Sequence, residues 1–85
     1  MYSINRNLII RKIECKYVII DMETGEITTF EGTGNVFFDI FLESKDEIKM
    51  FQYLIKKYEV EEETLEKDIM EFLQILLEKN IIQRK

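Results

Sequence analysis

Few side chains in this sequence could carry out chemistry, because it contains no histidine and a single cysteine. Without histidine there is no Ser–His or Cys–His nucleophile pair and no ordinary proton shuttle at neutral pH. Among the carboxylates, Glu62 and Glu66 stand four residues apart and could share a proton on a helix. Both belong to a strongly acidic segment, so a solvated charged surface is the better interpretation. We therefore expect no catalytic residues and a protein that is not an enzyme.

Cys15 offers no further chemistry, since one cysteine cannot form an internal disulfide or, without histidine, a structural zinc site. In or just after a strand it is more typical of a small hydrophobic residue than of a nucleophile. Tyr17, Tyr53 and Tyr58 are most simply amphipathic residues at the edge of a core. The carboxylates lack a loop with the spacing of calcium ligands. We therefore expect neither a metal nor a cofactor.

The elements that would position these side chains fit one domain over residues 1–85. A hydrophobic content of 46% can supply its core. No apolar run is long enough for a signal peptide or a membrane-spanning helix, so a cytoplasmic protein is expected. The first part is rich in Ile, Val, Tyr and Thr, with Gly25 placed in a tight turn. It predicts a three-stranded antiparallel sheet formed by residues 8–14, 17–21 and 26–30.

The second part contains no glycine after Gly34 and predicts helices over residues 35–43, 44–58 and 61–79. Thr33 or Asn35 can cap the first helix. Ser44, with Glu47 three residues on, resembles a capping box for the second.

The third predicted helix has more apolar surface than one core needs. At 100° per residue, its apolar arc runs from Ile75 to Met70 and spans about 220°, whereas a surface helix usually needs little over 100°. This helix either is packed on both sides or leaves one flank open for a partner. Asn80 is a plausible left-handed cap, after which Ile81 and Ile82 return to the core. An exposed third strand beside such a helix favours the binding of an extended peptide as an added strand.

The order of these features resembles the pyrroloquinoline quinone biosynthesis protein D (PqqD) family. The resemblance covers about residues 8–82 and is carried by "IIDMETGEITTF", Gly34 with "VFFDIF", "YEV" at 58–60 and "LEKDIMEFLQILLEKNII". Asn80 and the two isoleucines after it replace the usual Gly-Leu-Ile ending, and Glu31 stands where the family commonly has asparagine.

The resemblance implies an α+β, winged helix-turn-helix-like fold, in which a three-stranded antiparallel sheet is followed by three helices. It also implies a RiPP recognition element, which binds the leader of a ribosomally synthesised and post-translationally modified precursor peptide. A separate maturation enzyme, either a leader peptidase as in lasso-peptide systems or a radical-SAM enzyme, then acts on the precursor. The implied peptide-binding residues are Glu26, Ile27, Thr28, Thr29, Phe30, Leu65, Asp68, Ile69 and Phe72.

Within this set, Phe30 matches a core position of the family, so Ile27 and Thr29 are expected to border the groove. Leu65, Ile69 and Phe72 could each belong to the core instead, which is the commoner role for such side chains. Asp68 lies at the edge of the apolar arc and has the least structural reason to be there.

A winged-helix fold leaves a nucleic-acid-binding or regulatory protein as the alternative. The charge argues against it. Residues 1–20 have a net charge of +3, but residues 61–79 carry two basic and seven acidic side chains, which would repel phosphates. We expect no nucleic acid and no membrane as partners. The protein would be a monomer or a weak dimer formed through the exposed edge strand.

Overall fold

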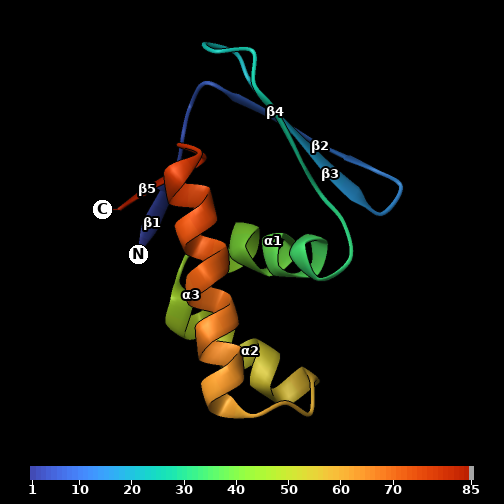
Figure 1. Ribbon diagram of the computed structural model, residues 1–85, viewed down its shortest axis with the longest axis vertical. Helices are drawn as coiled ribbons and strands as arrows, with labels where there is room; N and C mark the ends of the chain where they lie inside the picture. Colours follow the sequence, from blue (N-terminus) through green and yellow to red (C-terminus); the bar gives the residue numbers. More distant parts are fainter. Residues whose placement is uncertain (85) are drawn as a thin grey trace.

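A computed structural model describes residues 1–84, and its main elements follow the expected order (Figure 1). Their bounds are β1 (Tyr2–Ile4), β2 (Leu8–Ile13), β3 (Lys16–Asp21), β4 (Ile27–Phe30), α1 (Thr33–Ser44), α2 (Glu47–Lys57), α3 (Glu62–Glu78) and β5 (Ile82–Arg84). The fold is α+β, with a three-stranded antiparallel sheet followed by three helices, as the sequence predicted.

The three-stranded sheet has the order β2-β3-β4, with both pairs antiparallel. Between β3 and β4 the chain reverses at Gly25, whose φ of 77° is the positive value predicted for this turn. The Asp21 carboxylate supports the turn by accepting hydrogen bonds from the backbone N–H groups of Glu23 (2.8 Å) and Thr24 (3.2 Å). Because the strands follow one another in a meander, β4 lies at an edge of the sheet.

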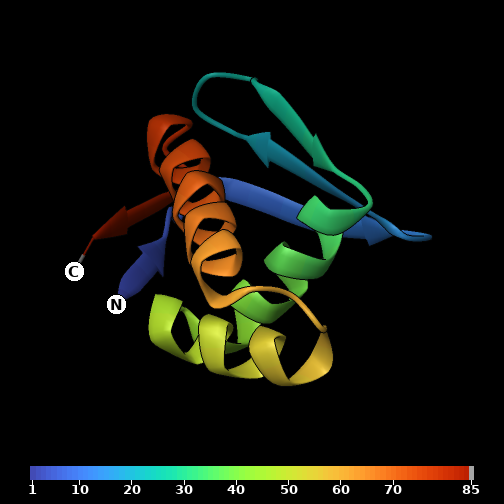
Figure 2. The same cartoon turned by 60° about the horizontal axis from the view of Figure 1, so that its bottom comes forward.

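The three helices gather on one side of this sheet (Figure 2), and an aromatic cluster joins the two layers. Phe38 of α1 is fully buried, and its ring centroid lies 4.9 Å from that of Tyr17 in β3 and 5.4 Å from that of Phe30 in β4. Phe30 also contacts Phe72 of α3, with a centroid distance of 5.4 Å. These contacts hold β4 against both α1 and α3.

A second, two-stranded sheet joins the ends of the chain and was not expected from the sequence. β1 pairs antiparallel with β5, so that Tyr2 lies opposite Arg84. Figure 2 shows the two termini side by side. Ile81 and Ile82 are 2% and 1% exposed, which confirms that the chain returns to the core after α3.

The start of α1 differs from the prediction. Gly32 is the N-cap, with a φ of 62°, and no side chain accepts a capping hydrogen bond there. Thr33 and Asn35 lie one and three residues further on, inside the first turn, so neither caps the helix. At the end of α3, Asn80 has a φ of 57°, which confirms the predicted left-handed residue.

The capping box predicted at Ser44 is also wrong. Asp46 is the N-cap of α2, and its carboxylate accepts a hydrogen bond from the Ile48 N–H at 2.9 Å. Ser44 is instead the last residue of α1, where its hydroxyl donates to the Ile40 carbonyl at 2.9 Å.

The wide apolar arc of α3 is buried at its centre and exposed at its two flanks. Met70 and Ile75, which bound the arc, are 49% and 43% exposed, while the residues between them form the core face: Leu65, Ile69, Phe72, Leu73 and Leu76. The helix is therefore packed along the middle of its apolar arc, as one interpretation expected, and open at the flanks, as the other expected. No helix within residues 1–84 has the length and apolar character needed to cross a bilayer.

Candidate peptide-binding site

The open edge of β4 carries backbone groups that can pair with another strand. The Asp21 N–H donates to the Glu26 carbonyl at 2.9 Å, and in an antiparallel ladder the bonding direction alternates from one residue to the next. Thr28 and Phe30 therefore bond to β3, whereas the N–H and C=O groups of Ile27 and Thr29 point to the open edge. Within residues 1–84, no other strand pairs with this edge.

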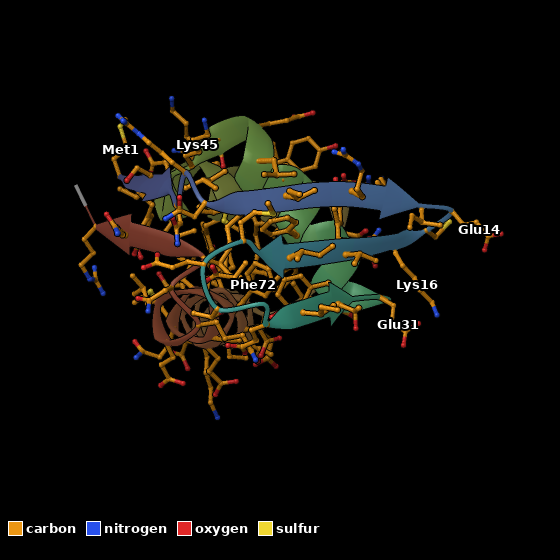
Figure 3. All side chains as sticks on the ribbon, turned by 90° about the horizontal axis from the view of Figure 1, so that it is seen from above. Met1, Glu14, Lys16, Glu31, Lys45 and Phe72 are labelled. Atoms are coloured by element: carbon orange, nitrogen blue, oxygen red, sulfur yellow. The ribbon has the colours of Figure 1, made fainter. Side chains whose placement is uncertain are left out.

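Helix α3 stands beside this edge. Figure 3 looks onto the sheet and shows α3 nearly end-on, next to the start of β4. Two contacts join them: the Lys79 ammonium lies 3.5 Å from the Glu26 carboxylate, and the Phe72 ring lies against that of Phe30. The ion pair is largely exposed and contributes little, so the aromatic contact is the main connection. A strand added to β4 would thus meet α3 on one side.

The side chains of β4 alternate between the two faces of the sheet. Thr28 and Phe30 are half-buried on the helix side, while Ile27 is 63% exposed and Thr29 is also exposed on the outer side. The expectation that the side chains of Ile27 and Thr29 border the groove is therefore corrected. Only their backbone groups reach the open edge, because Phe30 fixes the alternation by packing inward.

Three of the four predicted residues of α3 belong to the core. Leu65, Ile69 and Phe72 are 5%, 2% and 7% exposed. Asp68 is exposed and lies one helical turn before Phe72, on the same side of α3. The structure thus places the Phe72 ring against Phe30 of β4 and Asp68 in the lining of a cavity beside the start of α1, while Leu65 and Ile69 are buried in the core.

A cavity of about 500 Å³ extends this surface beyond the end of β4. It lies between the start of α1, the segment joining α2 to α3, and the first half of α3. Its lining consists of Gly32, Thr33, Val36, Phe37, Tyr58, Val60, Leu65 and Asp68. Val36, Tyr58 and Val60 were not among the predicted site residues. In the sequence, the apolar Tyr58 and Val60 stand out within an acidic segment, and they are a signal that could have pointed to this cavity.

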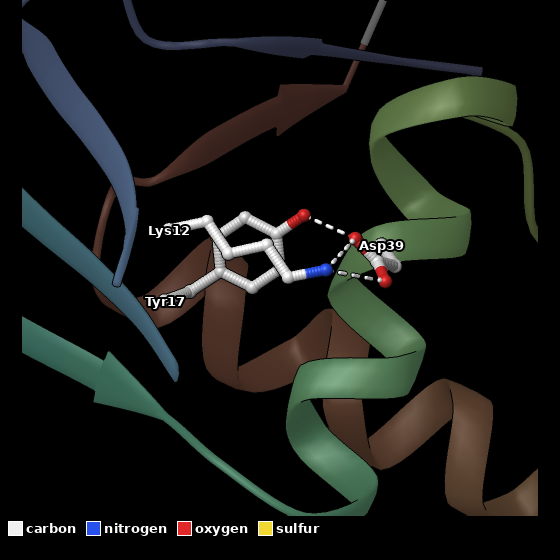
Figure 4. Close-up of polar contacts among 3 residues, drawn as sticks. All are labelled: Lys12, Tyr17 and Asp39. Atoms are coloured by element: carbon white, nitrogen blue, oxygen red, sulfur yellow. Dashed lines mark hydrogen bonds and ion pairs between the residues drawn. The ribbon is translucent and has the colours of Figure 1, made fainter. Parts of the chain in front are cut away.

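A polar cluster on the other side of α1 joins the sheet to that helix (Figure 4). The Tyr17 hydroxyl donates to the Asp39 carboxylate, which also lies 3.0 Å from the Lys12 ammonium. Burial and then the bond to Asp39 raise the pKa of Tyr17 to about 12. The same hydrogen bond, followed by the one from Lys12, lowers the pKa of Asp39. Tyr17 stays protonated at neutral pH, so the cluster is structural rather than a source of a base or a nucleophile.

We expect an ultraviolet titration of the tyrosines to show one group ionising near pH 12, and Asp39→Asn to move that midpoint towards 10.0. Burial would remain, so only part of the shift should disappear. The folded protein holds the Tyr17 proton more firmly, so its stability should fall as the pH rises from 10 to 12. The lowered pKa of Asp39 has the opposite sign: its contribution is lost as the pH falls below 3.8. An unchanged titration in Asp39→Asn would contradict this account.

The other candidates for chemistry are solvated. Glu62 and Glu66 are both exposed on α3, and Cys15 is exposed in the turn between β2 and β3. Cys15 thus lies just after a strand, as expected, but it is exposed rather than packed in the core, because the chain reverses there. Within residues 1–84, no three side chains form a cluster that could hold a metal ion.

Comparison with known proteins identifies a matching family and two solved structures of the same fold. The model of the family described as coenzyme PQQ synthesis protein D (PqqD) matches residues 16–82. The structure described as TbiB1 in complex with the TbiA(beta) leader peptide superposes with a TM-score of 0.88 at 20% identity, over 98% of this chain and 96% of that chain. Lasso peptide synthetase B1 complexed with the leader peptide gives 0.84 at 20% identity, over 98% of both chains. No curated protein sequence matches significantly. At this identity the two structures establish a shared fold.

Proposed function

The chain belongs to the PqqD family, and we propose that it is a RiPP recognition element that binds the leader region of a ribosomally synthesised precursor peptide. The leader would add as a strand to the open edge of β4 and lie against α3. The two structures of the same fold described above are, by their own descriptions, complexes with leader peptides.

The observation that carries this proposal is the open edge of β4 beside α3. The backbone groups of Ile27 and Thr29 offer two donors and two acceptors at this edge. Pairing with them gives affinity for any extended peptide, whereas side-chain pockets give selectivity. Two neighbouring surfaces are available for this selectivity: the side of α3 that carries the exposed Asp68, and the cavity that begins at Gly32.

We assign the predicted residues different roles within this site. The segment Glu26–Phe30 pairs with the peptide, Phe72 and Asp68 contact its helix-facing side chains, and Leu65 and Ile69 support them from the core. The Asp68 carboxylate can accept a hydrogen bond from the peptide or pair with a basic side chain of it. Because most of the side chains that line the cavity are apolar, the leader would present apolar side chains to it.

We further propose that the protein has no chemistry of its own and hands the bound precursor to a maturation enzyme, either a leader peptidase or a radical-SAM enzyme. The acidic face of α3 and the fold shared with leader-peptide complexes both favour peptide over nucleic acid.

Hydrogen exchange tests the binding mode residue by residue. The ligand would be a synthetic leader from a short precursor reading frame beside the gene. On binding, the amides of Ile27 and Thr29 should exchange about tenfold or more slowly, because each gains a hydrogen bond. The amides of Thr28 and Phe30 should be protected with or without peptide, since they already bond to β3. Saturable binding that leaves Ile27 and Thr29 unprotected would exclude strand addition to β4.

A further inference from the structure

A second groove lies between α2 and α3. Its volume is about 520 Å³, close to that of the cavity at the end of β4. It is lined by Glu47, Ile48, Phe51, Glu63, Glu66, Lys67, Ile69 and Met70, and we call it the α2–α3 groove.

The α2–α3 groove faces away from the peptide-binding site. Met70 follows Asp68 by two residues, which places it about 200° further round the helix. α2 lies at the end of the molecule opposite the three-stranded sheet (Figure 1). A ligand in this groove and a strand on β4 would therefore contact different sides of α3 and could bind at the same time.

The walls of this groove are apolar and exposed. Ile48 of α2 is 63% exposed and Met70 of α3 is 49% exposed, with the buried Ile69 and half-buried Phe51 between them. Scattered exposed apolar side chains are common in monomeric proteins. Here two of them lie on opposite walls of one groove whose floor is also apolar, which is the arrangement of an interaction surface.

The rim of the α2–α3 groove is acidic. Three carboxylates line it, those of Glu47, Glu63 and Glu66, and the one ammonium in its lining is that of Lys67. The Lys67 ammonium lies 4.0 Å from the Glu71 carboxylate, one helical turn further on. Within residues 1–84, none of the three rim carboxylates belongs to an ion pair. Glu47 and Glu63 favour the starts of their helices. Glu66 lies beyond the first turn of α3 and has no such role.

We propose that the α2–α3 groove docks a basic amphipathic helix of a partner protein. The apolar face of that helix would fit between Ile48 and Met70, and its lysine or arginine side chains would pair with the carboxylates of Glu47, Glu63 and Glu66. This surface goes beyond the proposed peptide site and does not depend on it. It would let the protein hold a peptide and a second protein on opposite sides of α3.

The probe for this proposal is an 18-residue helical peptide with leucine on one face and lysine on the other. We expect saturable shifts in the amide spectrum of the labelled protein, confined to residues around Ile48, Phe51 and Met70. Affinity should fall as salt is raised, because the rim charges are screened. Met70→Gln and Ile48→Gln should each weaken binding about fivefold, through lost apolar contact.

The controls separate this groove from general attraction to an acidic protein. Ile75→Gln changes a side chain of similar exposure on the other side of α3 and should bind the probe normally. A peptide with the same leucines and with glutamate in place of lysine should not bind. The proposal is overturned if the lysine peptide gives no saturable shifts, if shifts spread over all carboxylates, or if they centre on β4. Ile48→Gln should leave leader binding unchanged, so the proposed peptide site and the α2–α3 groove are tested independently.

Discussion

Replacing Phe38 with alanine should lower the free energy of unfolding by about 3–5 kcal/mol, the usual cost of removing a buried phenylalanine. Phe38 is fully buried in α1 and contacts the rings of Tyr17, Phe30 and Phe41. It is therefore the side chain through which β3 and β4 rest on α1. A domain of this size is stable by only about 5–15 kcal/mol, so this one change would remove a large part of the total.

Urea unfolding followed by circular dichroism measures this loss as a lower midpoint with an unchanged slope. Tyr53→Ala is the matched control, because Tyr53 is an aromatic residue of α2 that is 50% exposed. Its unfolding free energy should change by less than about 1 kcal/mol. A loss below about 1 kcal/mol in Phe38→Ala would mean that the aromatic cluster does not hold the two layers together.

Much of this fold could be predicted from local patterns in the sequence. The three strands of the main sheet and the three helices depend on local patterns, such as the glycine turn at Gly25 and the apolar spacing of α3. The pairing of β1 with β5 has no such signal. It joins Tyr2 to Arg84 across almost the whole chain, and three-residue strands are too short to show a period.

The start of α2 shows why local signals alone can mislead. Ser44 and Asp46 are both good N-cap residues, and the sequence pattern favoured Ser44 because Glu47 follows it. The choice depends on where α1 ends. Because α1 includes Ser44 and its left-handed C-cap is Lys45, with a φ of 52°, only Asp46 is free to cap the next helix.

The candidate site could likewise be predicted in outline. A meander leaves its last strand at an edge, so β4 was identified without the structure. The sequence did not show which residues of β4 turn their backbone N–H and C=O groups to this edge, because that follows from the hydrogen bond between the Asp21 N–H and the Glu26 carbonyl. The cavity depends on the segment between α2 and α3, which brings Tyr58 and Val60 to the start of α1. No local pattern encodes that contact.

The Thr29 N–H, which points to the open edge of β4, leads to the second large effect. Thr29→Pro should weaken leader binding about tenfold, because proline has no N–H and the lost donor is one that the peptide would use. The same change should leave the sheet intact. The Thr29 N–H points away from β3, and proline is tolerated on an edge strand when its nitrogen faces outward.

Thr29→Ala is the matched control, since it removes the same side chain and keeps the N–H. It should bind the leader with the affinity of the wild-type protein, because the Thr29 side chain lies on the outer face of the sheet. Calorimetric titration gives both affinities, and the amide spectrum shows whether each variant keeps the native fold. Strand addition to β4 requires the two variants to differ. If a folded Thr29→Pro protein bound as tightly as Thr29→Ala, the peptide would have to bind elsewhere on the molecule.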